Sequence, residues 1–318
     1  MADYLCIDGG TTNTRITLVS DGTVLESVCY PIGSGKRGNR ELLKEALKSG
    51  LAQMAETHGV ALHAVEAILA SGMITSAGGL CEIPHIPAPA GLRELHDAIT
   101  VKSIPEICEM PFHFIPGVKT VSDSLERSDI MRGEETELMG LGVDIADALV
   151  LLPGSHCKCI AVSPSSKIEQ FRTFLTGEML HALSSTTILS QTVDLAVPAD
   201  KDFMKKGYEY CEKHGINEAL FKTRILDTRL SCTPAQCTGF FMGAVLCGEL
   251  RQIAKAPQSR LILAGKKELK DAAAYLLTHV SQKEVICVGD TAAANAPALG
   301  AVKIYEAQRE TESRRNGV

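Results

Sequence analysis

The residues best suited to chemistry lie near the start of the chain, in a polar stretch between two apolar runs. The first run ends in Asp8, and the residues that follow are small and polar: Gly9, Gly10, Thr11, Thr12 and Asn13. Glycines let the backbone approach a ligand closely and adopt positive φ angles, and the N–H groups of such a turn form a concavity that binds anions. A carboxylate at the end of the strand is suited to hold Mg²⁺, usually through water. The stretch predicts a phosphate-binding hairpin with Asp8 at the metal, and an ordinary hairpin with a polar turn is the alternative.

The same arrangement returns in the second half of the chain. An apolar run over residues 149–152 leads into Pro153, Gly154, Ser155 and His156, and a second strand-like run follows over residues 157–162. Two hairpins of this kind indicate an internal duplication at the scale of a domain. We therefore expect each half to offer one turn whose backbone N–H groups bind phosphate.

Carboxylates crowd residues 129–140, where the sequence predicts the start of a helix. The segment holds Asp129, Arg132 and three glutamates, of which Glu134 and Glu135 are adjacent. The helix macrodipole favours negative side chains in a first turn, so capping is one interpretation. The other is a charged site, with Arg132 beside the glutamates at the mouth of the helix.

The composition restricts the class of protein. The chain has 318 residues, a formal net charge of −6 and only 4% aromatic residues, which disfavours a nucleic-acid surface and a base-stacking platform. The densest apolar run, over residues 240–247, is too short to span a bilayer. The first residues lack the pattern of a signal peptide, and the eleven cysteines are scattered without a disulfide framework. We expect a cytoplasmic protein with reduced thiols that binds neither nucleic acid nor membrane.

Alternating and helical periodicities place the first motifs on an α/β scaffold. Residues 23–30 alternate as a third strand, and residues 41–58 carry apolar side chains on one face of a helix. Residues 65–70 form a short buried strand that opens into a glycine-rich loop over residues 71–79. Such a loop at the carboxyl end of a strand either binds a ligand or forms a simple turn. The G-x-G-x-x-G match over residues 33–38 follows a half-polar strand, which favours a flexible loop over a dinucleotide fingerprint.

The second half contains further predicted elements. Thr176 is in a position to cap a helix. Residues 237–254 are predicted to form an apolar helix that contains three glycines. Residues 260–265 form a strand that ends in Ala264 and Gly265, and a helix, a strand over residues 285–288 and a last helix follow it. Residues 189–229 are mixed helical and polar, and they carry no motif with recognisable chemistry.

In this order, the elements resemble the sugar-kinase/Hsp70/actin superfold. That superfold has two duplicated ribonuclease-H-like α/β domains with ATP in the cleft between them. The two hairpins resemble its phosphate loops, and residues 261–265 resemble its adenosine strand and turn. The resemblance implies an N-terminal α/β domain over residues 1–143 with the acceptor side, and a C-terminal α/β domain over residues 144–318 with the adenosine site. Packing of the last helix back on the first domain is left open.

Four motifs narrow the resemblance to one family. They are residues 129–140 with their Met-Arg-Gly-Glu-Glu-Thr core, residues 153–158, residues 171–173 with 176–178, and residues 289–292. Together they resemble the 2-dehydro-3-deoxygalactonokinase family over nearly the whole chain. Members of that family use MgATP to phosphorylate the 6-hydroxyl of 2-dehydro-3-deoxy-D-galactonate in galactonate breakdown. The chain departs from the family where Gly9 and Cys159 stand in place of a common tryptophan, and where Ser155 replaces a usual threonine.

The resemblance implies a role for each candidate residue. ATP, with Mg²⁺ at Asp8, is expected at the two turns and the adenosine turn, namely at Asp8, Gly9, Gly10, Thr11, Thr12, Asn13, Gly154, Ser155, His156, Lys158, Ala264 and Gly265. Phosphoryl transfer needs positioning and charge neutralisation together with a general base. Glu135 is favoured for that base, followed by Glu134 and Asp129.

The acceptor is expected to be a small sugar acid. A planar guanidinium suits its carboxylate, so Arg132 and Arg172 are predicted to bind it, with Gly72 and Met73 beside them; a structural ion pair is the alternative role for each arginine. A homodimer is one possible assembly. Two other functions stay open on the same fold: an exopolyphosphatase-like phosphohydrolase and a kinase of a different sugar acid. A nucleotide-binding regulator is disfavoured, because binding alone requires no base.

Overall fold

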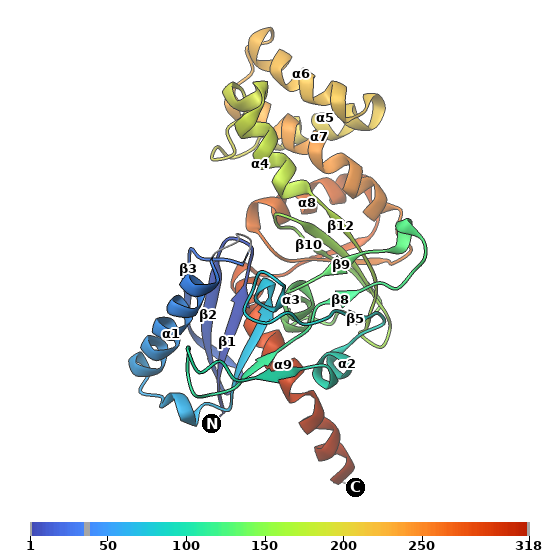
Figure 1. The fold of residues 1–318 in the computed structure, drawn as a ribbon. Coiled ribbons are helices and arrows are strands. Elements are labelled where there is room, and N and C mark those ends of the chain that lie inside the picture. Colours follow the sequence, from blue (N-terminus) through green and yellow to red (C-terminus); the bar gives the residue numbers. More distant parts are fainter. Residues whose placement is uncertain (1, 35–38, 317–318) are drawn as a thin grey trace. The chain divides into compact units, whose positions relative to one another are not determined.

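The computed structural model describes residues 2–34 and 39–316, which form two compact units (Figure 1). Unit 1 consists of Met1–Asp144, Ser165–Gln170 and Thr291–Val318, and unit 2 consists of Ile145–Pro164 and Phe171–Asp290. Residues 35–38, which belong to the predicted flexible loop, lie outside the described residues. None of the helices in the described part of the chain has the length and apolar character needed to cross a membrane.

Unit 1 is built on a 6-stranded sheet of order β3-β2-β1-β4-β7-β6. Its strands are β1 (Asp3–Gly9), β2 (Thr14–Ser20), β3 (Thr23–Tyr30), β4 (Ala67–Gly72), β6 (Thr100–Lys102) and β7 (Phe112–Phe114). The first three pair antiparallel, which confirms the predicted hairpin and third strand, whereas β4 pairs parallel with β1 and β7 pairs parallel with β4. Helix α1 (Arg40–Thr57) buries its apolar face, including Leu43 and Leu47, in the same core as Ile16 and Leu18 of the sheet.

The remaining elements of unit 1 are short, apart from the last helix. They are η1 (Leu62–Ala64), η2 (Met73–Thr75), β5 (Ile86–Pro87), α2 (Leu92–Asp97), β8 (Val118–Lys119), η3 (Leu125–Arg127), β9 (Ile130–Met131), α3 (Glu134–Gly140) and α9 (Asp290–Asn316), of which Asp290 belongs to unit 2. Strands β5, β8 and β9 form a 3-stranded sheet. The helix predicted within residues 129–140 begins only at Glu134, because Gly133 interrupts the backbone with a φ of 110°. Asp129 lies ahead of β9 instead.

Unit 2 repeats the strand arrangement in a 5-stranded sheet of order β12-β11-β10-β13-β14. Its strands are β10 (Ala148–Leu152), β11 (Cys157–Val162), β12 (Ile168–Phe174), β13 (Arg260–Leu263) and β14 (Glu284–Cys287), and residues 168–170 of β12 belong to unit 1. As in unit 1, the first hairpin is antiparallel and the next strands in the sheet are parallel to its first strand. The predicted duplication of an α/β fold is therefore confirmed.

Helices cover the sheet of unit 2 and extend from it as one group, α4 to α7 (Figure 1). They are α4 (Thr176–Thr186), η4 (Ile188–Gln191), α5 (Lys201–His214), α6 (Ile216–Thr228), α7 (Pro234–Ala254) and α8 (Lys267–Val280). The buried face of α7 belongs to the core of this unit. The predicted cap by Thr176 is wrong: Leu175 occupies the N-cap position, and Thr176 is the first residue inside α4.

Candidate active site

The turn of unit 1 that follows β1 is closed by backbone hydrogen bonds. Gly10 N–H donates to the Asn13 carbonyl at 2.8 Å, and Ser34 N–H donates to the Gly10 carbonyl at 3.0 Å. Thr11, Thr12 and Asn13 are exposed at the tip. Of the five predicted phosphate-binding residues, Gly10 to Asn13 therefore form a turn with an accessible tip, and Gly9 is the buried last residue of β1.

Asp8 ends β1 beside the glycine-rich loop that follows β4. The strands pair in parallel with Asp8 opposite Ser71 and Gly9 opposite Gly72. Gly72 adopts a φ of +78°, and a Cβ there would lie 2.5 Å from the Gly9 carbonyl oxygen and 3.3 Å from Asp8 Oδ1. Only glycine is accommodated at this position. The structure thus brings Gly72 and the predicted metal residue together.

Negative charge accumulates around Asp8. Burial raises the pKa of its carboxyl, Glu134 raises that pKa further, and Arg15 opposes the rise. Asp8 lines a small hollow together with Arg15, Thr17, Ser71 and α9 residues including Pro297. Asp8 offers carboxylate oxygens of the kind that Mg²⁺ prefers, and within the described residues it is not joined by a group of three or more His, Cys, Asp or Glu side chains that could hold a metal ion.

Helix α3 presents its glutamates in two directions. Both carboxylate oxygens of Glu135 accept from the Gly133 N–H, at 2.8 and 2.9 Å, and Glu135 is 0% exposed. Glu134 is half-buried and accepts from the Arg132 N–H at 2.9 Å. Glu137 lies three residues further along the helix, which places it on the face of Glu134. Burial raises the pKa of Glu137 to about 8, with Glu134 and Asp8 contributing, and Arg15 opposes that rise.

The three glutamates therefore differ in what they are able to do. Burial and the nearby Glu134 also raise the pKa of Glu135 to about 8. Its two carboxylate oxygens, however, accept from the Gly133 N–H at the start of the same helix. Glu134 and Glu137 interact electrostatically with Asp8. Glu137 was missed by the sequence analysis, although its spacing of three residues from Glu134 was a usable signal. Asp129 lies outside α3 and accepts from the Ile130 N–H at 2.7 Å.

Arg132 holds the loop that follows β4. Its NH1 donates to the Thr75 carbonyl at 2.6 Å and to the Thr75 hydroxyl. Its NH2 donates to the Ile83 carbonyl at 2.9 Å and lies 3.2 Å from Nδ1 of His85. The Arg132 guanidinium is therefore engaged within unit 1 at both terminal nitrogens. Met73, the other predicted substrate residue of this loop, begins η2 and is half-buried.

The turn of unit 2, defined here as Gly154–His156, lies on the first residues of α4. A Cβ on Gly177 would lie 2.2 Å from the Gly154 carbonyl oxygen, and Glu178 N–H donates to the Ser155 carbonyl at 3.1 Å. His156 Nε2 lies 3.0 Å from Glu178 Oε1. A Cβ on Gly154 would meet only the His156 carbonyl oxygen, at 3.4 Å, so there is free space on this side of the turn.

The other predicted ligand residues of unit 2 lie on its sheet. Lys158 on β11 is 5% exposed, and its Nζ donates to the Thr173 hydroxyl at 2.8 Å. Arg172 on β12 is exposed, and its NH1 donates to Gln252 Oε1 at 2.9 Å. The two cations therefore differ in solvent exposure: Lys158 is buried, and Arg172 is exposed to solvent.

The predicted adenosine turn is joined to the turn of unit 2 through Pro153. Lys266 N–H donates to the Pro153 carbonyl at 3.0 Å, and Ala264 N–H donates to the Leu151 carbonyl at 3.0 Å. Gly265 has a φ of +88°, and a Cβ there would lie 2.6 Å from the Pro153 carbonyl oxygen. The structure thus places Ala264 and Gly265 next to the residue that precedes Gly154.

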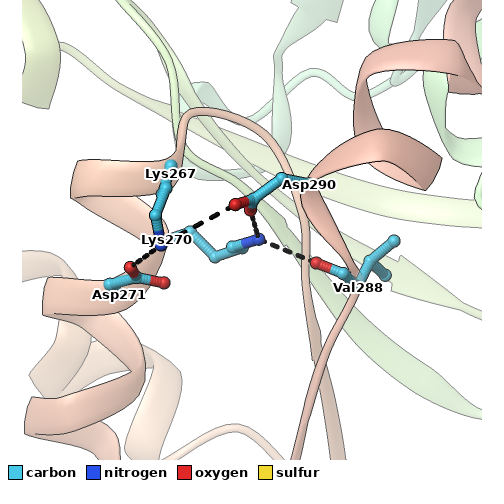
Figure 2. Close-up of polar contacts among 5 residues, drawn as sticks. All are labelled: Lys267, Lys270, Asp271, Val288 and Asp290. Carbon is cyan, nitrogen blue, oxygen red and sulfur yellow. Dashed lines mark hydrogen bonds and ion pairs between the residues drawn. The ribbon is translucent and has the colours of Figure 1, made fainter.

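Helix α8 then anchors the family-like motif at residues 289–292 (Figure 2). Lys270, only 3% exposed, donates to the Val288 carbonyl at 2.7 Å and to Asp290 Oδ1 at 2.5 Å. Lys267 pairs with Asp271 at 2.7 Å and with Asp290 at 3.7 Å. The hydrogen bond from Lys270 is the main cause that lowers the pKa of Asp290. Asp290 is thereby fixed to the helix that follows the adenosine turn.

Comparison with known proteins identifies the family. The sequence profile of the 2-keto-3-deoxy-galactonokinase family matches residues 8–298. The 2-dehydro-3-deoxygalactonokinase of Escherichia coli (strain K12) is 29% identical over 253 residues, which cover 78% of this chain and 78% of the relative.

Two solved structures share the fold. A protein from Sinorhizobium meliloti, provisionally assigned as a 2-dehydro-3-deoxygalactonokinase, has a TM-score of 0.76 at 22% identity and covers 96% of each chain. The ligand-bound xylulose kinase of Lactobacillus acidophilus has a TM-score of 0.53 at 10% identity and covers 96% of this chain and 89% of its own. The predicted sugar-kinase fold is confirmed, and the match over residues 8–298 shows that the chain belongs to the 2-keto-3-deoxy-galactonokinase family.

Proposed function

We propose that this chain transfers the γ-phosphoryl group of MgATP to the 6-hydroxyl of 2-dehydro-3-deoxy-D-galactonate, a step of galactonate catabolism. The observation that carries the proposal is the family match over residues 8–298, which spans both turns and α3. The cytoplasmic location and the homodimer that the sequence suggests stay predictions.

Binding of ATP is assigned to backbone donors. The turns at Gly9–Asn13 and Gly154–His156 offer N–H groups to phosphate oxygens, and preorganised donors of this kind stabilise the charge that develops during transfer. The turn at Ala264–Gly265 is assigned to adenosine. Asp8 would hold Mg²⁺, and when bound the ion would neutralise charge on the phosphates.

The general base is assigned to Glu134 in place of Glu135. A base must reach the hydroxyl from which it takes the proton, and the fully buried Glu135 is occupied by the Gly133 N–H. Glu134 is partly exposed, and it interacts electrostatically with Asp8. Glu135 then serves to close the first turn of α3.

The carboxylate of the sugar acid is assigned to Arg172. A bidentate grip needs two free N–H groups of one guanidinium, and those of Arg132 are engaged by Thr75 and Ile83. Arg172 is exposed on β12, and Gln252, which accepts from its NH1, is exposed too, so a ligand is able to replace that hydrogen bond. Arg132 instead keeps the Gly72–Gly79 loop in place. Arg172→Lys is expected to raise KM for the sugar acid far more than KM for ATP, and equal effects on both would contradict this assignment.

The experiment that tests the function is ADP release from MgATP with each of several acceptors. We expect strong stimulation by 2-dehydro-3-deoxy-D-galactonate and little by its gluconate epimer or by a neutral sugar. Stimulation by a different sugar acid would overturn the acceptor and keep the kinase. Phosphate release from polyphosphate without stimulation by any sugar acid would overturn the kinase.

A further inference from the structure

Glu249 is the only acidic residue of α7, and the proposed reaction does not use it. Glu249 belongs to the buried face of the helix, together with Leu246, Leu250 and Ile253, and is 4% exposed. Burial of a carboxylate is costly unless hydrogen bonds compensate it. The partners of Glu249 therefore show what this unusual residue does.

Two donors from separate elements meet at the Glu249 carboxylate. The Thr176 hydroxyl donates to Oε2, and the Cys157 thiol donates to the same carboxylate. Burial raises the pKa of Glu249 to about 7, and these two hydrogen bonds oppose the rise. Thr176 is 5% exposed and Cys157 is 0% exposed. Because Cys157 begins β11 and Thr176 begins α4, one carboxylate joins the starts of both elements.

Both elements border the turn of unit 2. Cys157 follows His156 directly, and Gly177, next to Thr176, lies against Gly154 too closely for a Cβ. Glu249 therefore links the first residue of α4 to the first residue of β11, and both elements adjoin the turn.

We propose that Glu249 is a positioning residue that maintains the conformation of the unit 2 turn by holding Thr176 and Cys157 together. This inference rests on the proposed function, because the turn is assigned there to phosphate. Donors that are held in place before the ligand arrives bind it without a cost for ordering them. Glu249 acts entirely through its two partners.

The test is amide hydrogen exchange of the ligand-free full chain. Thr176→Val removes the hydroxyl and keeps the shape of the side chain, whereas Thr176→Ser keeps the hydroxyl. Thr186→Val is the matched control, because Thr186 is an exposed residue of the same helix whose hydroxyl bonds to the Ala182 carbonyl. We expect exchange in residues 154–157 and 176–178 to be about tenfold faster in Thr176→Val. We expect it to match the wild type in Thr176→Ser and Thr186→Val.

Kinetics of the same variants provide the second readout. Thr176→Val is expected to raise KM for ATP about tenfold and to leave KM for the sugar acid unchanged, and Thr176→Ser is expected to restore the wild-type value. Unchanged exchange at the turn, or an equal change in Thr186→Val, would overturn the role of Glu249. A wild-type chain without kinase activity would overturn the proposed function instead, because the exchange comparison does not depend on turnover.

If the Thr176→Val protein does not fold, Glu249→Gln tests the same proposal. Glu249→Gln keeps the side-chain volume but leaves one acceptor oxygen for two donors. We expect exchange at residues 154–157 to rise about threefold in this variant. Exchange identical to the wild type would overturn the proposal.

Discussion

The close packing of α3 on α9 gives the sharpest test of how the acidic helix is positioned. A Cβ on Gly300 would lie 1.7 Å from the Thr136 carbonyl oxygen, and a Cβ on Gly140 would lie 1.8 Å from the Ala296 carbonyl oxygen. In both cases the obstacle is backbone, which has no rotamer to change. We therefore choose Gly300→Ala as the perturbation.

The magnitude follows from that distance. Real Cβ atoms essentially never approach another heavy atom within 3.0 Å, so α3 and α9 must separate by more than about 1 Å in a close-packed interior. Overpacking costs about 1–3 kcal/mol, and the higher helix propensity of alanine returns at most about 1 kcal/mol. A shift of about 1 Å in a catalytic group costs about 10²-fold in rate. Because Glu134 is on α3, we expect kcat to fall by about that factor.

The assay combines turnover with thermal unfolding. Gly248→Ala is the matched control, because Gly248 is also helical and a Cβ there would meet nothing within 4 Å. We expect Gly248→Ala to keep wild-type kcat and an unfolding temperature at or above the wild type. A Gly300→Ala protein with wild-type kcat and an unfolding temperature equal to that control would refute the reasoning.

Three further predictions follow from the charged groups. Glu134→Gln is expected to lower kcat by about 10²–10⁴-fold with little effect on KM for ATP, whereas a folded Glu135→Gln protein that lost as much turnover would contradict the assignment of the base to Glu134. The pKa of Glu135 is raised from 4.5 to about 8, so between these values the folded protein retains a proton that the unfolded chain has released, and the free energy of unfolding falls as pH rises. Urea unfolding should therefore show the stability of Glu135→Gln improving relative to the wild type from pH 5 to pH 8, and a constant difference would refute the raised pKa. Lys270→Met leaves the Val288 carbonyl without its donor and should cost about 1–3 kcal/mol of unfolding free energy; the control Lys267→Met, at an exposed residue, should cost less than about 0.5 kcal/mol, and equal losses would exclude a special role for Lys270.

Much of the fold follows from local patterns. The two apolar runs beside the first turn and the alternation of residues 23–30 correspond to three antiparallel strands, and the helical spacing of residues 41–58 corresponds to α1 within one residue at each end. The glycines at the ends of β1 and β13 mark turns that are present in the structure. These features were predictable because strand and helix periodicities and turn residues act over a few neighbouring positions.

The direction in which a charged side chain points was not predictable in the same way. Sequence reasoning preferred Glu135 as the base and gave Arg132 a ligand role, and it placed Thr176 as a cap. In the structure the buried Glu135 carboxylate accepts from the Gly133 N–H, and Arg132 donates to Thr75, which lies 57 residues away in the sequence. Thr176 meets Glu249, 73 residues further along the chain.

The sequence by itself determined the class of protein, its family and the segments that carry the chemistry, because motifs and periodicities are local properties of the chain. The tertiary structure alone decided which side chains of those segments are accessible to a ligand and which are hydrogen-bonded within the protein. The physical reason is burial: a carboxylate or guanidinium that is withdrawn from water must find hydrogen-bond partners, and those partners come from whichever distant elements pack against it. The separate roles now assigned to Glu134, Glu135 and Glu249 all depend on that packing.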